Sequence, residues 1–94
     1  MSEINKIVLT FEKSLTAIAG YKFGEEIYEK QVENKYKSGS KNVIEFPEQI
    51  DSVAISFVQG FLKKLIKNNG ISKMKEEIEI VGNPKFVKKF NKVI

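Results

Sequence analysis

The sequence predicts an α/β domain in which a small, mostly parallel sheet of three to four strands packs against three helices. Short runs rich in β-branched residues alternate along the chain with longer stretches whose apolar residues recur at helical spacing. Parallel strands need helix-length connections between them, and this alternation supplies them. The length of 94 residues fits one domain, spanning residues 1–94.

The first part of the chain is expected to hold one or two strands and a helix. Residues 4–11 (INKIVLTF) predict a strand, and their apolar character predicts a central position in the sheet. Residues 15–19 (LTAIA) fit either the second strand of a hairpin or a loop with a helical turn, because short apolar runs are ambiguous. Gly20 and Gly24 predict a sharp turn or a close backbone approach. A helix is predicted from residue 24 to about residue 37.

The stretch from residue 43 to residue 70 carries the clearest pattern. The run VIEF at residues 43–46 predicts a buried strand, and Pro47 ends it because proline lacks a backbone donor. Asp51 and Ser52 are candidate N-caps of the following helix. That helix is expected to end at Gly70, which adopts positive φ without a side-chain penalty. Its wide apolar stripe consists of Ala54, Phe57, Val58, Phe61, Leu62, Leu65 and Ile66.

The remaining residues predict a connector, a further strand and a last helix. Residues 71–77 (ISKMKEE) fit a loop or extended connector, and residues 78–81 fit a short strand. Asn83 is the expected N-cap and Pro84 the first residue of a helix that runs to the end of the chain. The apolar side of this helix consists of Phe86, Val87, Phe90, Val93 and Ile94.

The charge of the chain is unevenly distributed. The net charge is +4, made up of −2 over residues 1–34, zero over residues 35–60 and +6 over residues 61–94. All sixteen basic residues are lysine, and the absence of arginine argues against sequence-specific nucleic-acid recognition. We expect a solvated lysine-rich face, with nucleic-acid binding as the alternative. This candidate basic face consists of Lys63, Lys64, Lys67, Lys85, Lys88, Lys89 and Lys92.

The composition also excludes several classes of chemistry. The chain has no Cys and no His, which removes the usual zinc and copper sites and the Ser–His and Cys–His dyads. Two carboxylate clusters, at residues 25–29 and 76–79, lack the spacing of a cation-binding loop and are expected to be solvated. We therefore expect no metal, no cofactor and no enzymatic activity. The absence of cysteine and of any long apolar run predicts a cytoplasmic protein without a membrane span.

Several of these segments together resemble a known family. The VIEF strand, followed by a turn and by Ser56-Phe57 at the opening of a long apolar helix, is similar to the STAS-like domains of bacteria and their phages. These are small relatives of the anti-anti-sigma STAS domains. Lys22 and Gly24 resemble the family's residues at the start of its first helix, and residues 78–81 and 84–94 resemble its closing strand and helix.

The resemblance implies a STAS-like fold and regulation by protein contact rather than catalysis. In STAS regulators, a serine at the start of the helix after the central strand is phosphorylated by a partner kinase, which controls binding to the kinase or to an anti-sigma factor. Ser56 occupies the matching position. The chain departs from the family pattern in having Ala54 and Ile55 where an acidic residue usually precedes the serine, and Phe57 where a small residue usually follows it.

The sequence thus predicts a non-enzymatic regulatory module that binds a protein partner through the start of its second helix. The candidate switch residues are Ser56 and Ser52, whose alternative roles are a backbone hydrogen bond in the first helical turn and an N-cap. Ile55 lies off the apolar stripe, so it is expected either to be exposed, as a contact surface would require, or to pack under a neighbouring loop. The full candidate interface consists of Gln49, Asp51, Ser52, Ile55, Ser56 and Gln59. A small phage or mobile-element inhibitor of a host factor remains a further alternative.

Overall fold

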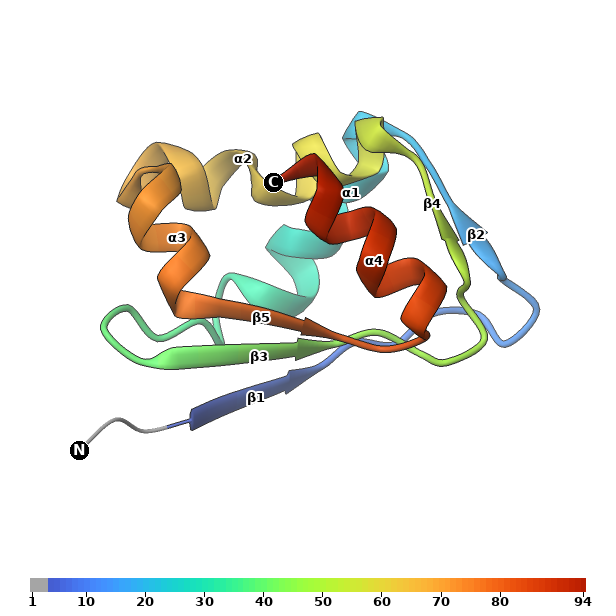
Figure 1. Ribbon diagram of the computed structural model, residues 1–94, viewed down its shortest axis with the longest axis horizontal. Helices are drawn as coiled ribbons and strands as arrows, with labels where there is room; N and C mark the ends of the chain where they lie inside the picture. The colour runs from blue at the N-terminus through green and yellow to red at the C-terminus, as the bar shows by residue number, and fades with distance from the viewer. Residues whose placement is uncertain (1–3) are drawn as a thin grey trace.

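The computed structural model describes residues 4–94 and contains a three-stranded parallel sheet covered by helices on one side (Figure 1). The strands are β1 (Ile4–Val8), β3 (Lys41–Glu45) and β5 (Ile78–Val81), in the spatial order β1-β3-β5. Both pairings are parallel, and the middle strand β3 is paired along both of its edges. The predicted α/β class with a mostly parallel sheet is therefore confirmed.

Four α-helices and one π-helical turn make up the second layer, where the sequence predicted three helices. They lie above the sheet in Figure 1, and no helix or strand within residues 4–94 covers its opposite face. The side chains of Ile4 and Val8 on that face are 71% and 50% exposed. The helical elements are α1 (Tyr21–Ile27), the π-helical turn η1 (Tyr28–Val32) that continues it, α2 (Ile55–Asn69), α3 (Ile71–Glu77) and α4 (Pro84–Val93).

A second, two-stranded sheet lies apart from the first. It pairs β2 (Ala17–Ile18) with β4 (Ser52–Val53) in parallel. The Ala54 N–H donates to the Ile18 carbonyl at 2.9 Å, which extends this pairing to the residue before α2. The segment 15–19 therefore contains a strand, but its partner is β4 rather than a neighbouring hairpin strand.

The core is organised around Phe46, the residue that follows the central strand. Its ring lies 4.6–6.4 Å, centroid to centroid, from five other phenylalanine rings. Such pairs contribute beyond the burial of their area. The rings come from the loop after β1 and from the predicted apolar faces of α2 and α4, which are thereby confirmed; they are Phe11, Phe57, Phe61, Phe86 and Phe90.

Two glycines let α1 and α2 pack backbone to backbone. A Cβ atom on Gly24 would lie 2.7 Å from the Phe61 nitrogen, and one on Gly60 would lie 2.8 Å from the Tyr21 carbonyl carbon. Real Cβ atoms essentially never come this close to backbone atoms. The close approach predicted for Gly24 is confirmed, and its counterpart is Gly60, which the sequence pattern did not single out.

A buried polar network fixes the loop between η1 and β3 at the amino ends of the strands. The Asn42 side chain is fully buried and bonds the backbone of Lys37 in both directions at 2.9 Å. Glu77 accepts from the Tyr36 hydroxyl at 2.8 Å and from the Gly39 N–H at 2.6 Å. Burial alone raises the pKa of the Glu77 carboxyl, but these two hydrogen bonds and nearby Lys73 hold that pKa below its ordinary value. The prediction that the 76–79 carboxylates are all solvated is wrong for Glu77.

Several predicted boundaries and positions are wrong. β1 ends at Val8 and lies at the sheet edge, because the middle position belongs to β3. The first helix begins at Tyr21, three residues before the predicted start. The second helix begins at Ile55, and its N-cap is Ala54 rather than Asp51 or Ser52. These two residues precede the helix because β4 pairing takes up that part of the backbone.

Residues 71–77 form a helix rather than the predicted connector. Gly70 ends α2 at a φ of 83°, as predicted, but the chain then re-enters a helix at once. The Met74 N–H donates to the Gly70 carbonyl at 3.0 Å, and the Met74 side chain is completely buried. The strand at Ile78–Val81 is confirmed, as is the start of α4, where Asn83 accepts from the Lys85 N–H and Pro84 is the first helical residue.

Candidate protein-binding surface

The first turns of α1 and α2 lie side by side. The Gly20 N–H, just before α1, donates to the Ser56 Oγ at 3.1 Å, in the first turn of α2. One turn further on, Gly60 packs against the backbone of Tyr21. We use the name α2-start surface for the residues that this packing gathers, namely Tyr21, Ser52, Ile55, Ser56 and Gln59.

Two large side chains of the α2-start surface are exposed to solvent. Ile55 is 55% exposed, as predicted, and Tyr21 is 40% exposed. Ile55, Gln59 and Lys63 follow one line along α2 at four-residue spacing. The Lys63 ammonium lies 5.7 Å from the centre of the Tyr21 ring, which is within cation–π distance. This interaction favours a position of the ring along α2. The exposed Tyr21 ring therefore lies near Lys63, two turns along α2 from Ile55, and the polar Gln59 stands between Ile55 and Lys63 on the same line.

The two candidate switch serines differ in environment. Ser56 is half-buried, and its hydroxyl joins α2 to α1 rather than bonding within its own helical turn. Ser52 is exposed in β4 and does not cap α2, which has no side-chain cap. A modification of Ser56 would therefore act on the contact between two helices, whereas one on Ser52 would act on a short strand.

Two of the predicted interface residues are used differently. The Gln49 amide donates to the carbonyls of Glu12 and Leu15 at 2.6 and 3.1 Å, so this side chain fastens the loop after β1. Asp51 is exposed, but its backbone N–H is bonded to the Thr16 carbonyl next to β2. Tyr21 was absent from the prediction, because only the packing of α1 on α2 brings it against Gly60 and near Lys63.

The predicted basic face is divided in the structure. Lys63 pairs with Glu25 at 3.3 Å, and Lys64 pairs with Glu29 at 3.6 Å and Glu33 at 3.2 Å. These α2 lysines thus face the acidic side of α1 and η1. Lys67, in the last turn of α2, is exposed.

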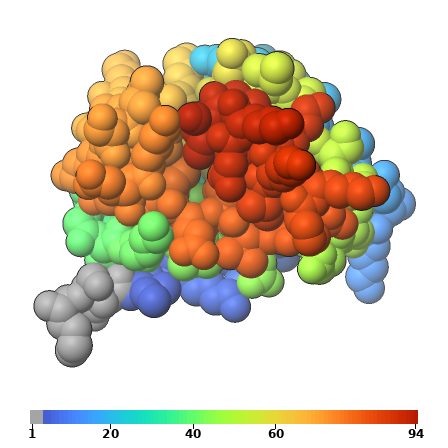
Figure 2. Space-filling model, viewed as in Figure 1, coloured from blue at the N-terminus to red at the C-terminus, as the bar shows by residue number. Residues whose placement is uncertain are grey.

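The lysines of the last helix form a separate surface. Within residues 4–94, no carboxylate lies within 4.0 Å of any of them. Figure 2 shows α4, coloured red, on the face toward the viewer, with α3 in orange beside it. We call this the α4 lysine surface, and it consists of Lys85, Lys88, Lys89 and Lys92.

Within the described part of the chain, no group of three or more Asp or Glu side chains could hold a metal ion. No helix among residues 4–94 is long and apolar enough to cross a membrane. Comparison of the chain with protein-family models, with curated proteins and with solved structures gives no match. The resemblance to STAS-like domains stays a prediction.

Proposed function

We propose that this chain is a non-enzymatic regulatory module that binds a protein partner through the α2-start surface. The observation that carries the proposal is the Ile55 side chain, which is 55% exposed at the first residue of the longest helix. The start of α1, which packs on α2, carries a second exposed side chain, Tyr21. The centres of protein interfaces are enriched in such apolar and aromatic side chains, and their rims are polar. Gln59, one turn further along α2, and Ser52, in the strand before the helix, are exposed polar residues near Ile55 in the sequence.

The rigidity of the underlying packing supports the same proposal. Gly24 and Gly60 hold α1 against α2 through backbone contacts, which leave little freedom for the two first turns to move apart. Binding to a surface that is already ordered loses less conformational entropy than binding to a mobile one. Tyr21 has few rotatable bonds, which favours it further as an interface anchor.

Ser56 is the proposed site of phospho-regulation, in line with the resemblance to STAS regulators. A phosphate on its Oγ would lie at a helix start, where backbone N–H groups and the helix dipole favour negative charge. Phosphorylation would also replace the hydroxyl that accepts from the Gly20 N–H, and it would add charge beside Ile55. We expect it to weaken binding of an apolar partner without unfolding the domain.

The proposal is tested by capturing partners from a lysate of the cells that produce the chain. The wild type is compared with Ile55→Asp and with Ile71→Asp as a matched control. Ile71 is also the first residue of its helix and is 56% exposed, but it lies at the opposite end of α2. We expect one protein that is captured by the wild type and the control and is lost with Ile55→Asp. Hydrogen exchange on the purified complex should then show protection at residues 52–59.

If the same proteins are captured by the wild type and by Ile55→Asp, with both folded by circular dichroism, the proposed surface is wrong. The regulatory part is tested on the captured partner with Ser56→Glu and with Ser52→Glu as its control. Weaker binding of Ser56→Glu alone would support a switch at Ser56. Equal binding of both variants would contradict it.

A further inference from the structure

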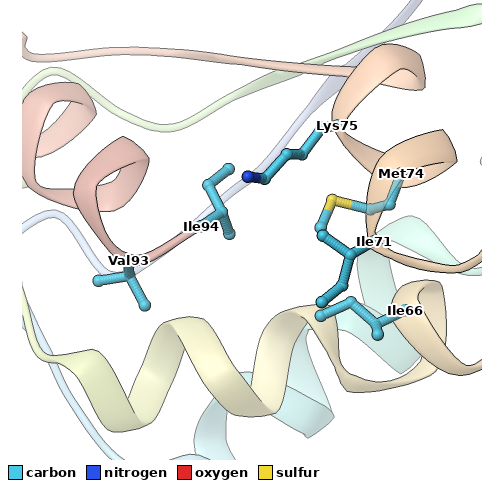
Figure 3. A pocket seen from close by; sticks show the side chains of 6 residues that line it. All are labelled: Ile66, Ile71, Met74, Lys75, Val93 and Ile94. Atoms are coloured by element: carbon cyan, nitrogen blue, oxygen red, sulfur yellow. The ribbon is translucent and has the colours of Figure 1, made fainter.

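An apolar notch lies where the ends of α2 and α4 meet α3 (Figure 3). Its volume is about 190 Å³. Ile71 forms an exposed part of its wall, and Met74 a fully buried part. The side chain of Lys75 extends across it with its nitrogen toward Ile94, as Figure 3 shows. The complete lining consists of Ile66, Ile71, Met74, Lys75, Val93 and Ile94.

The α4 lysine surface leads directly into this notch. Lys85, Lys89 and Val93 are spaced four residues apart and follow one line along α4, so the positive charges continue to the apolar wall. Lys88 and Lys92 form a parallel line. A second, more open hollow of about 350 Å³ lies among the four lysines. An apolar recess and a row of ammonium groups thus form one continuous surface.

The arrangement of these lysines is unfavourable for the isolated helix. Lys85–Lys89 and Lys88–Lys92 are like-charge pairs at four-residue spacing, which destabilise a helix. Lys85 also lies in the first turn, where the helix dipole disfavours positive charge. By contrast, Lys63 and Lys64 on α2 are matched by glutamates. Carboxylates supplied by a partner would relieve the repulsion on α4.

We propose that the notch and the α4 lysine surface together bind an acidic protein segment through one apolar anchor side chain. An apolar cavity of about 150 Å³ is large enough to bind benzene. A notch of about 190 Å³ therefore accepts one leucine or phenylalanine side chain. The ten residues of α4 span about 15 Å, a distance that four to five residues of extended chain cover. Acidic residues within about five positions of the anchor therefore reach the lysines.

The same observations favour a peptide over a nucleic acid. Single-stranded nucleic acids are bound by stacking of bases on exposed aromatic rings. The two aromatic residues of α4, Phe86 and Phe90, are completely buried. Tyr21, the most exposed aromatic residue among residues 4–94, belongs to α1 and the α2-start surface. The side chains that line the notch are apolar except for Lys75, which suits an apolar side chain rather than a base or a phosphate.

The test is a fluorescence-anisotropy titration with a synthetic, labelled peptide that carries one leucine between two groups of three glutamates. We expect binding to the wild type that weakens at least tenfold when the leucine is replaced by alanine. Ile71→Asp, which places a negative charge in the notch, and Lys89→Glu, which reverses the charge next to it, should each weaken binding at least tenfold. Ile55→Asp and Lys22→Glu, exposed substitutions on the α2 and α1 first turns, should leave the affinity unchanged.

Three results would overturn the proposal. One is equal affinity for the leucine and alanine peptides, which would show that only charge is recognised. Another is tighter binding of a single-stranded oligonucleotide of the same charge, which would make the lysines a nucleic-acid site. The third is no binding of the leucine peptide up to about 1 mM, a Kd that corresponds to only about 4 kcal/mol. Because the two surfaces use different variants, Ile55→Asp tests the proposed function and Ile71→Asp tests this inference separately.

Discussion

Replacing Gly60 with alanine should destabilise the domain, because the added methyl group would force α1 away from α2. The added Cβ would lie 2.8 Å from the carbonyl carbon and 3.1 Å from the Cα of Tyr21, and closer still to the carbonyl oxygen of that residue, where ordinary contacts are 3.4–4 Å. All three neighbours are backbone atoms, so no side-chain rotation can make room. The helices must therefore separate, and the packing of the Tyr28 ring on the Phe61 ring, now 6.0 Å apart, would loosen with them.

The size of the loss follows from two opposing effects. Alanine gains about 1 kcal/mol over glycine in a helix interior. Overpacking costs about 1–3 kcal/mol, and a rigid backbone neighbour places this site at the upper limit. We expect a net loss of about 2 kcal/mol, from a total stability of roughly 5–14 kcal/mol for a chain of this length.

The measurement is urea unfolding followed by far-ultraviolet circular dichroism. Gln59→Ala is the control, because Gln59 is exposed one position earlier on α2 and its truncation should change the free energy of unfolding by less than about 0.5 kcal/mol. A Gly60→Ala protein as stable as the wild type, or more stable, would refute the backbone-to-backbone packing of α1 on α2. If Gly60→Ala and Gln59→Ala both lower the free energy of unfolding, α2 is sensitive to any substitution and the effect is not specific to the contact with α1.

Three further substitutions test the polar contacts of the fold. Asn42→Ala should lose about 2–4 kcal/mol of unfolding free energy in urea, because buried backbone groups lose their partners; a loss below about 1 kcal/mol would mean that water replaces them. The pKa of Glu77 is lower in the folded protein than its ordinary value of 4.5. Its carboxylate therefore stabilises the fold at pH values above 4.5, and this stabilisation is lost as the pH falls through the lowered pKa. In the wild type, the urea midpoint of unfolding should fall between pH 7 and about pH 3, and in Glu77→Gln it should fall less. Glu76→Gln, at an exposed position, should show the same fall as the wild type. An equal fall in Glu77→Gln and the wild type would contradict this role of Glu77. Asn83→Ala should lose about 1–2 kcal/mol in thermal melts, because it removes both the α4 cap and the hydrogen bond from the Asn83 amide to the Glu48 carbonyl. Asn83→Ser, which keeps a cap acceptor and places no charge beside that carbonyl, should lose less.

The elements that could be predicted are those whose pattern is contained in their own residues. The apolar stripes of α2 and α4 each repeat over several turns, and the cap at Asn83 needs only its neighbours. The two-residue strands β2 and β4 have no such pattern, since each exists only because the other is beside it. The α3 helix has just two apolar residues, Ile71 and Met74, too few to show a period.

The candidate surfaces divide in the same way. The exposure of Ile55 could be predicted from its position off the helical stripe. The position of Tyr21 on α2 could not be predicted, because it depends on how α1 crosses α2. The sequence also did not predict that, within residues 4–94, the basic face is divided into paired α2 lysines and unpaired α4 lysines. This division depends on which lysines lie close to the glutamates of residues 25–33 in the folded chain.

The strand order has a consequence for how the chain folds as it is synthesised. Neither strand pair of the main sheet joins neighbours in the sequence, since Ile4 pairs with Lys41 and Asn42 pairs with Ile78. At 5–20 residues per second, β3 is made roughly 2 to 7 seconds before β5 is complete. During that interval one edge of the central strand has no partner in its own chain, and unpaired strand edges promote aggregation. The yield of folded protein should therefore depend on how soon β5 is made and pairs with β3.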